Sequence, residues 1–165
     1  MDTEATTIKD ILLVEDDRQD AELALAALEG HLANRVAVVE NGAEALDYLY
    51  RRGKFTSRPG GNPIIVLLDN KMPKVSGLEV LQIIKDDGQL RMIPVVALTS
   101  SRRTQDLIEF YEHGVNAYVV KPLDFSEFGV AIRQLIAFWA TVNEPPPPAG
   151  RPETPFKGEE VVCAG

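Results

Sequence analysis

Short apolar runs alternate with helical patterns along most of the chain. Five of these runs are rich in branched side chains and are mostly continuous, without a polar residue at every second position; they cover residues 11–14, 36–39, 64–68, 95–98 and 118–120. Runs of this kind are typical of parallel strands that are covered on both faces. The pattern therefore predicts five largely buried strands.

Segments with apolar residues at helical spacing lie between these runs. They cover residues 18–29, 43–51, 77–86 and 103–113. A last helix is expected to begin near Asp124, because Asp124 and Glu127 have the spacing of a capping box. Strands that alternate with helices indicate an α/β domain with a parallel sheet, and right-handed crossovers leave few possible strand orders.

Length and local composition predict one folded domain with polar ends. The chain has 165 residues, enough for a single domain with a sizeable core. Residues 1–7 are expected to be a flexible N-terminus, residues 8–143 the domain, and residues 144–165 a proline-rich tail. Residues 51–63 contain four basic residues and no acid. A solvated connection is the favoured interpretation of this loop, and docking of a kinase is the alternative.

Composition excludes several classes of function. The net charge is −8, which argues against nucleic acid as the main partner. No apolar run approaches the length of a membrane span, and no signal peptide opens the chain. Cys163 is the only cysteine, so a disulfide framework is excluded and a cytoplasmic location is expected.

Polar residues with chemical potential follow four of the predicted strands. Glu15 and Asp16 follow the first strand, Asp69 the third, Thr99 the fourth and Lys121 the fifth. The carboxyl ends of parallel strands share one edge of a sheet, and ligands bind there at the point where strand order reverses. If the order is 2-1-3-4-5, the acids meet at that point.

Three carboxylates in one pocket repel each other unless some are protonated or a cation neutralises them. Carboxylate oxygens suit Mg²⁺, which keeps several waters and often binds together with phosphate. Lys121 adds a positive charge and Thr99 a hydroxyl group. Together these groups are suited to the binding and transfer of a phosphoryl group.

The motifs resemble those of the receiver domain of two-component response regulators. The matching stretches are "ILLVEDD", "VLLDNKMPKVSG", "VVALTSS" and "GVNAYVVKPLD", within residues 8–142. The spacing also agrees, since Thr99 lies 30 residues and Lys121 52 residues after Asp69. The resemblance implies a flavodoxin-like (βα)5 fold, doubly wound around a parallel sheet of order 2-1-3-4-5.

The resemblance also implies a role for each polar residue. Asp69 would be the phosphoacceptor, and Mg²⁺ (or Mn²⁺) would be held by Glu15, Asp16, Asp69 and the backbone carbonyl of Lys71. The phosphoryl group would be contacted by Lys121, with Thr99 and Tyr118 as the switch residues. The Lys121–Pro122 peptide bond would be cis.

A closer resemblance is to the single-domain regulators that serve phytochrome-type histidine kinases. It is carried by the basic loop before the third strand and by the C-terminal stretch "FGVAIRQLIAFWATVN". The chain departs from those regulators directly after Asp69, where Asn70-Lys71 stands in place of the frequent Leu-Asn. We hypothesise that the Lys71 side chain alters the rate of dephosphorylation.

The last helix carries two apolar stripes rather than one. Phe138 and Trp139 are adjacent in sequence, so both cannot face the same core. One interpretation is a wide core face covered by the tail. The favoured one is an interface of a homodimer, with Phe125, Phe138, Trp139 and Val142 as the candidate residues.

Three functions compete for this set of residues. The favoured one is a phosphorylation switch that accepts a phosphoryl group from a histidine kinase and signals through protein contacts. Beyond phosphotransfer and autodephosphorylation, such a switch is not an enzyme. The second is a Mg²⁺-dependent aspartyl phosphohydrolase, which would commonly place an acid where Lys71 stands. The third is an unphosphorylated scaffold, which the complete set of acids, Thr99 and Lys121 argues against.

Overall fold

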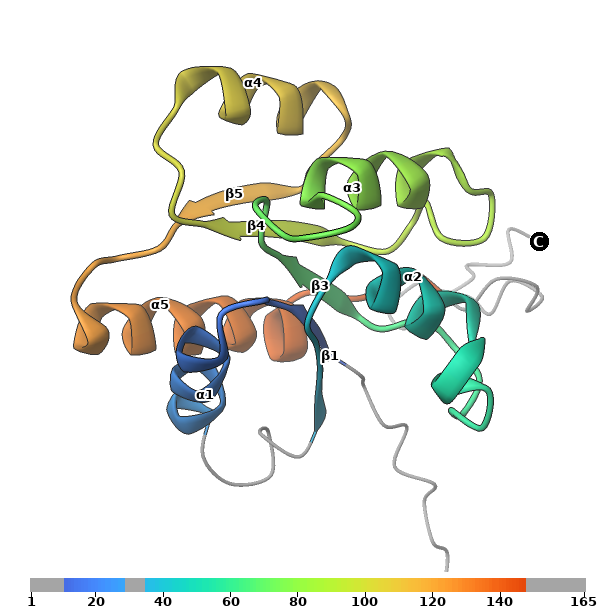
Figure 1. The fold of residues 1–165 in the computed structure, drawn as a ribbon. Coiled ribbons are helices and arrows are strands. Elements are labelled where there is room, and N and C mark those ends of the chain that lie inside the picture. Colours follow the sequence, from blue (N-terminus) through green and yellow to red (C-terminus); the bar gives the residue numbers. More distant parts are fainter. Residues whose placement is uncertain (1–10, 29–34, 148–165) are drawn as a thin grey trace, which may run out of the picture.

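The computed structural model describes residues 11–28 and 35–147, and it contains one parallel five-stranded sheet (Figure 1). The strand order is β2-β1-β3-β4-β5. The strands are β1 (Ile11–Val14), β2 (Val36–Val39), β3 (Ile65–Leu68), β4 (Val95–Thr99) and β5 (Ala117–Val120). Each begins and ends within one residue of its predicted bounds, so the predicted α/β class and the 2-1-3-4-5 order are confirmed.

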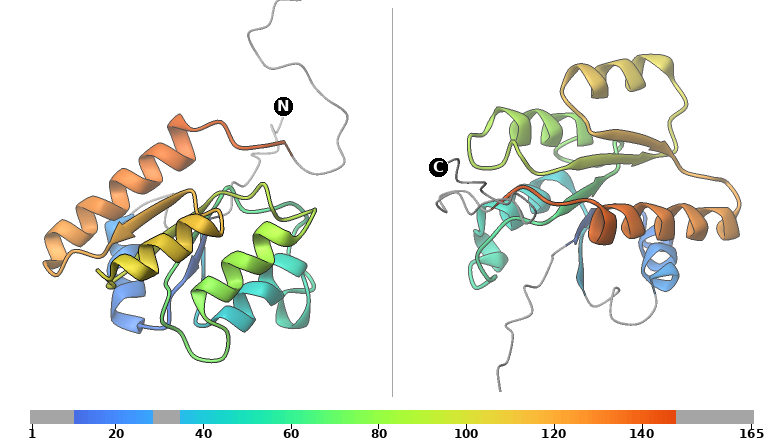
Figure 2. Two further views of the ribbon diagram at one scale, coloured as in Figure 1. Left: turned by 90° about the horizontal axis from the view of Figure 1, so that it is seen from above. Right: turned by 180° about the vertical axis from the view of Figure 1, so that it is seen from behind.

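Helices cover both faces of the sheet. They are α1 (Arg18–Ala27), α2 (Gly42–Tyr50), α3 (Gly77–Asp86), α4 (Thr104–Glu112) and α5 (Phe125–Ala137), with a short 3-10 turn η2 (Gly53–Phe55) and a π-helical turn η3 (Phe138–Val142). Figures 1 and 2 show α1 and α5 side by side on one face, while α2, α3 and α4 lie on the other. None of the helices in the described ranges has the length and apolar character that a membrane span requires.

The alternation of side chains along the strands divides the core into two layers. Leu12 and Leu68 pack with α2, α3 and α4, whereas Leu13 and Leu67 pack with α1 and α5. All four side chains are almost fully buried, as expected when a continuous apolar strand has helices on both sides. The third strand therefore runs through the middle of the core and delivers the residue after it to the edge of the sheet.

Helix caps explain several of the boundaries. The side chains of Asp17, Asn41, Ser76 and Asp124 each accept a hydrogen bond from a backbone N–H in the first turn of the helix that follows. Such N-caps satisfy donors that have no partner within the helix. The predicted start of the last helix at Asp124 is confirmed.

The loop of residues 51–63 is more ordered than a solvated connection. Arg58 is only 8% exposed. Its guanidinium lies over the Tyr48 ring at 4.4 Å and donates to the carbonyls of Tyr48 (3.0 Å) and Gly61 (2.9 Å). The planar fork of an arginine can satisfy several carbonyls and stack on an aromatic ring at once. The expectation that all four basic residues are solvated is therefore wrong at Arg58.

The C-terminal elements separate the two apolar stripes. Trp139 is partly buried against the α1–α5 layer of the core, whereas Phe138 remains 47% and Val142 73% exposed. Phe125 is 61% exposed at the start of α5. Trp139 therefore fits the interpretation of a wide core face, and the other three side chains are exposed, Phe125 at the start of α5 and Phe138 and Val142 in η3. The predicted flexible segment 1–7 and most of the predicted tail, residues 148–165, lie outside the described residues.

Candidate functional site

Asp69 lies where the middle strand of the sheet ends. Its backbone N–H donates to the carbonyl of Val14 on β1 (3.1 Å), which continues the sheet one residue beyond β3. The side chain is buried, and its Oδ1 accepts a hydrogen bond from the N–H of Asn70 at 2.8 Å. The Gly77 N–H closes the following loop on the Asn70 carbonyl at 2.9 Å. This acid is thus held by backbone contacts on both sides.

Glu15 and Asp16 meet Asp69 at this edge. One carboxylate oxygen from each of the three residues lies within 4.8 Å of the others. Glu15 and Asp69 are buried and Asp16 is exposed. Oxygen ligands from clustered carboxylates are what Mg²⁺ and Mn²⁺ prefer in proteins, so the donor set fits the expected cation. Asp17, the next acid in the sequence, instead caps α1.

Lys121 projects from the end of β5 into the same cluster. Its Nζ lies 2.5 Å from Glu15 Oε2, 2.9 Å from Asp20 Oδ2 and 3.6 Å from Asp69 Oδ2. Asp20, in the first turn of α1, has no predicted role in the sequence. An acid at that position is ordinarily explained by the helix dipole, so no sequence signal singled it out.

Burial dominates the protonation of this cluster. It raises the pKa of Glu15 to about 7, against the lowering effect of the Lys121 hydrogen bond. It also raises the pKa of Asp69, which the charge of Lys121 partly offsets. Burial alone would lower the pKa of Lys121, but hydrogen bonds to Glu15 and Asp20 outweigh it and raise that pKa. Lys121 is therefore a cation beside two acids, Glu15 and Asp69, whose pKa values are raised.

We expect the free energy of unfolding of the metal-free protein to fall as pH rises from about 4.5 to about 7. In that window the folded protein keeps a proton on Glu15 that the unfolded chain, with the ordinary pKa of 4.5, has released. Deprotonation then favours the unfolded state. Urea titrations at several pH values within the window check this. A free energy of unfolding that rises across the window would contradict it.

Thr99 and Tyr118 are joined through Ser101. Thr99 ends β4 almost fully buried, and its Oγ1 accepts a hydrogen bond from the Ser101 N–H at 3.2 Å. The Tyr118 hydroxyl donates to the Ser101 carbonyl at 3.2 Å. Ser101 Oγ in turn donates to Asp106 of α4 at 2.5 Å. A short polar chain therefore links the predicted switch residues to α4, and the sequence had assigned no role to Ser101.

Lys71 and the Lys121–Pro122 peptide bond are the remaining predicted features of the site. The Lys71 side chain is exposed, and its carbonyl stays a predicted ligand. None of the peptide bonds in the described ranges is cis, so the expectation of a cis Lys121–Pro122 bond is wrong. The trans isomer is preferred by about 0.5–1 kcal/mol before proline, and with it Lys121 already reaches Glu15 and Asp20.

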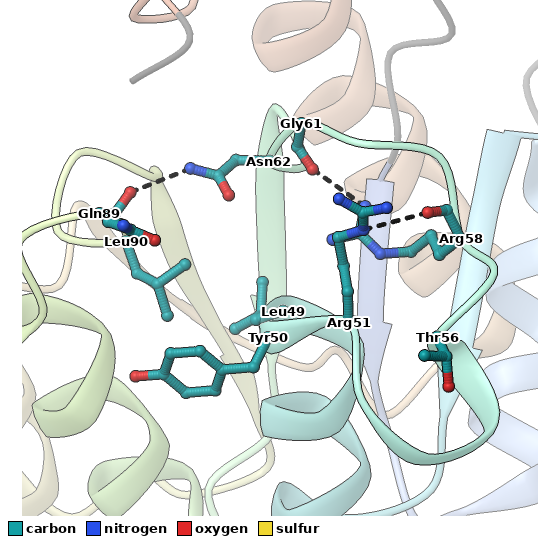
Figure 3. Close-up of a pocket in the computed structure, with 9 residues that line it drawn as sticks. All are labelled: Leu49, Tyr50, Arg51, Thr56, Arg58, Gly61, Asn62, Gln89 and Leu90. Atoms are coloured by element: carbon teal, nitrogen blue, oxygen red, sulfur yellow. Dashed lines mark hydrogen bonds between the residues drawn. The ribbon is translucent and has the colours of Figure 1, made fainter. Parts of the chain in front are cut away.

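A cavity of about 530 Å³ lies at the opposite edge of the sheet. It is lined by the end of α2, the loop of residues 51–63 and the segment that precedes β4 (Figure 3). Hydrogen bonds connect residues that line the cavity, from Arg51 Nε to the Arg58 carbonyl and from Asn62 to the Gln89 carbonyl. Because these segments come before β3 and β4, the cavity is remote from the acids that follow β1 and β3.

The fold and the acid edge together define a receiver domain of two-component signalling. The chain belongs to that family, because the model of the response regulator receiver domain matches residues 11–133. Receiver domains bind Mg²⁺ or Mn²⁺ at an acidic pocket, and the cluster of Glu15, Asp16 and Asp69 is consistent with this.

Similar solved structures place the chain near phytochrome response regulators. The bacteriophytochrome response regulator RtBRR is 59% identical, with 84% of each chain covered and a TM-score of 0.66. The phosphorylated cyanobacterial phytochrome response regulator RcpA is 34% identical over 84% of this chain and 99% of its own, with a TM-score of 0.78. The Mn²⁺-bound form of Rcp1, a response regulator of Synechocystis sp., is 33% identical over the same shares, with a TM-score of 0.77.

Proposed function

We propose that the chain is a phosphorylation-controlled switch with Asp69 as the phosphoacceptor. The observation that carries this is the convergence of Asp69 with two further acids and Lys121 at one edge of the sheet. A carboxylate oxygen of Asp69 attacks the phosphorus of a phosphohistidine. The phosphorus–nitrogen bond breaks, the imidazole nitrogen keeps the electron pair and takes up a proton, and an acyl phosphate remains on Asp69.

The residues around Asp69 have two roles in this transfer, metal binding and the supply of positive charge. Glu15, Asp16, Asp69 and the Lys71 carbonyl would hold Mg²⁺ or Mn²⁺, which supplies positive charge to the phosphoryl oxygens. Lys121, 3.6 Å from Asp69 Oδ2, supplies a second positive charge from the protein. Transfer of a phosphoryl group depends mainly on such positioning and charge.

The polar chain around Ser101 gives the switch an output. Thr99 and Tyr118 both bind Ser101, and Ser101 binds α4 through Asp106. A phosphoryl group on Asp69 offers an acceptor to the Thr99 hydroxyl, which in the unphosphorylated protein accepts from the Ser101 N–H, and so draws Thr99 toward Asp69. Withdrawal of Thr99 from Ser101 then changes the contacts of α4 and Tyr118, as in other switches that act through a local polar change.

The kinase partner is proposed to be a histidine kinase of the phytochrome type. Support comes from the relatives, since RtBRR is described as a bacteriophytochrome response regulator and RcpA as a phytochrome response regulator. Nucleic acid is not a proposed partner, given the net charge of −8.

A direct test is phosphorylation of the purified protein. Incubation with acetyl phosphate and Mg²⁺, followed by intact mass measurement, should add one phosphoryl group to the wild type and none to Asp69→Asn. Asp86→Asn, which makes the same change on the exposed surface of α3, is the control and should be phosphorylated normally. Absence of added mass on the wild type would remove the proposal. Repeated turnover of a phosphate ester would favour the hydrolase.

We expect the chain to self-associate through the exposed apolar side chains of Phe125, Phe138 and Val142. These side chains are 61%, 47% and 73% exposed, and exposed apolar patches commonly mark interfaces. Phe138→Asp should weaken the dimer at least tenfold in sedimentation equilibrium, because association would then bury a charge. Tyr111→Asp, at another exposed aromatic residue, should not. A monomeric wild type at micromolar concentration would exclude this arrangement.

Lys71→Asn is expected to shorten the half-life of the phosphorylated protein by about two- to fivefold, the range that an exposed ion pair supplies. Lys71 is exposed two residues after Asp69, where its ammonium can pair with the phosphoryl oxygens. The decay of phosphorylated protein after removal of the donor gives the half-life. Lys74→Asn, in the same loop and also exposed, should leave it unchanged. Equal half-lives for wild type and Lys71→Asn would contradict the role.

A further inference from the structure

Lys121 is bound more closely by Glu15 and Asp20 than by Asp69. Its Nζ lies 2.5 Å from Glu15 and 2.9 Å from Asp20, but 3.6 Å from Asp69. The last distance exceeds the range of a hydrogen bond. In the unphosphorylated protein the ammonium group of Lys121 is thus held to one side of Asp69.

The position of Asp20 is fixed from two directions. Its backbone N–H donates to the Asp17 side chain at 3.1 Å, which anchors the first turn of α1. Ala21 and Ala24 are buried and turn the same helix toward the sheet. The Asp20 side chain keeps 30% of its surface exposed, so its charge remains partly solvated.

Glu15 and Asp20 differ in whether a divalent cation can also bind them. Glu15 belongs to the oxygen cluster that fits a divalent cation, so its carboxylate would be shared between that cation and Lys121. Asp20 lies outside the cluster, and its contact with Lys121 does not compete with metal binding. Asp20 would consequently remain as the partner of Lys121 when Glu15 binds the divalent cation.

We propose that Asp20 is a positioning residue that holds Lys121 between phosphorylation events and competes with the phosphoryl group for it. This inference rests on the proposed function of Asp69. It has two consequences of opposite sign. The negative charge of Asp20, and its hold on Lys121, favour a divalent cation at the acid cluster. The same charge and the same ion pair with Lys121 disfavour an anionic phosphoryl group on Asp69, because that phosphoryl group must draw Lys121 away from Asp20.

The opposite signs provide the test. Asp20→Asn keeps the shape of the side chain and removes its charge. We expect it to weaken the binding of Mn²⁺ about three- to tenfold and to strengthen the binding of beryllofluoride, a phosphoryl mimic, by a similar factor at saturating metal. Both affinities are measured by calorimetry on the full chain. Glu22→Gln, which removes an exposed charge from the same helix, should change neither.

Two further variants separate positioning from a structural role. Asp20→Glu restores the charge and should bring both affinities back toward those of the wild type. In a Lys121→Met background, Asp20→Asn should lose most of its effect on beryllofluoride, because the residue acts through Lys121. A general loosening of α1 would weaken both ligands and lower the midpoint of thermal unfolding. Beryllofluoride affinity that is unchanged or lower in Asp20→Asn would overturn the inference, whereas a wild type that binds no beryllofluoride would overturn the proposed function itself.

Discussion

Replacing Gly77 by alanine is expected to lower the free energy of unfolding by about 3 kcal/mol, at the upper end of what a forced overpacking costs. A Cβ at this position would lie 2.0 Å from the carbonyl oxygen of Asp69 and 2.8 Å from the Cα of Asn70. Both are backbone atoms, so no side chain can rotate away. The loop after β3 must therefore move, and Asp69 moves with it.

The measurement is a urea titration of wild type and Gly77→Ala, combined with the rate of phosphorylation by acetyl phosphate. We expect the variant to lose both stability and rate. Gly88→Ala is the matched control, because a Cβ at Gly88 meets no atom within 4 Å, and it should change neither quantity measurably. Wild-type behaviour of Gly77→Ala would show that the loop has more freedom than its hydrogen bond to Asn70 indicates.

Lys121→Met is expected to slow phosphorylation of Asp69 about 100-fold, as the loss of a single preorganised charge at a reaction centre often does. Methionine fills similar space but leaves Glu15, Asp20 and Asp69 without their shared cation. The pKa of buried Glu15 should then rise above about 7, because the lowering effect of the Lys121 hydrogen bond is lost. The initial rate of phosphoryl addition at saturating Mg²⁺ measures the loss.

Lys54→Met makes the same chemical change at an exposed site. Lys54 pairs with Glu44 at 3.0 Å, and the Lys54 side chain is 64% exposed, so its contribution is expected to be small. The control should therefore be phosphorylated at the rate of the wild type. If Lys121→Met also kept the rate of the wild type, the charge of Lys121 would have no part in the transfer.

The sequence predicted the fold and the main cluster for one physical reason. Strands buried on both faces must be continuously apolar, so the first polar residue after each run marks the edge of the sheet. Glu15, Asp69 and Thr99 were all found in this way. The strand order then brought them together without any information about side-chain contacts.

Features that depend on contacts between distant residues were not predicted. Lys121 and Asp20 are separated by 101 positions, and neither residue indicates its partner in the sequence. Arg58 stood in a basic, polar loop, so its burial against Tyr48 could be found only from the structure. The exposure of the C-terminal apolar residues was predicted in part, because the sequence showed that Phe138 and Trp139 face different directions but not which of them packs against the core.

The pair of Glu15 and Lys121 also has a consequence for how the molecule assembles. The two residues are 106 positions apart, and they meet only after the first and the last strand have both joined the sheet. Closing so long a loop carries an entropic cost that early, local structure does not offset. The acids that follow β1 and β3 can therefore come together before Lys121, which follows β5, reaches them.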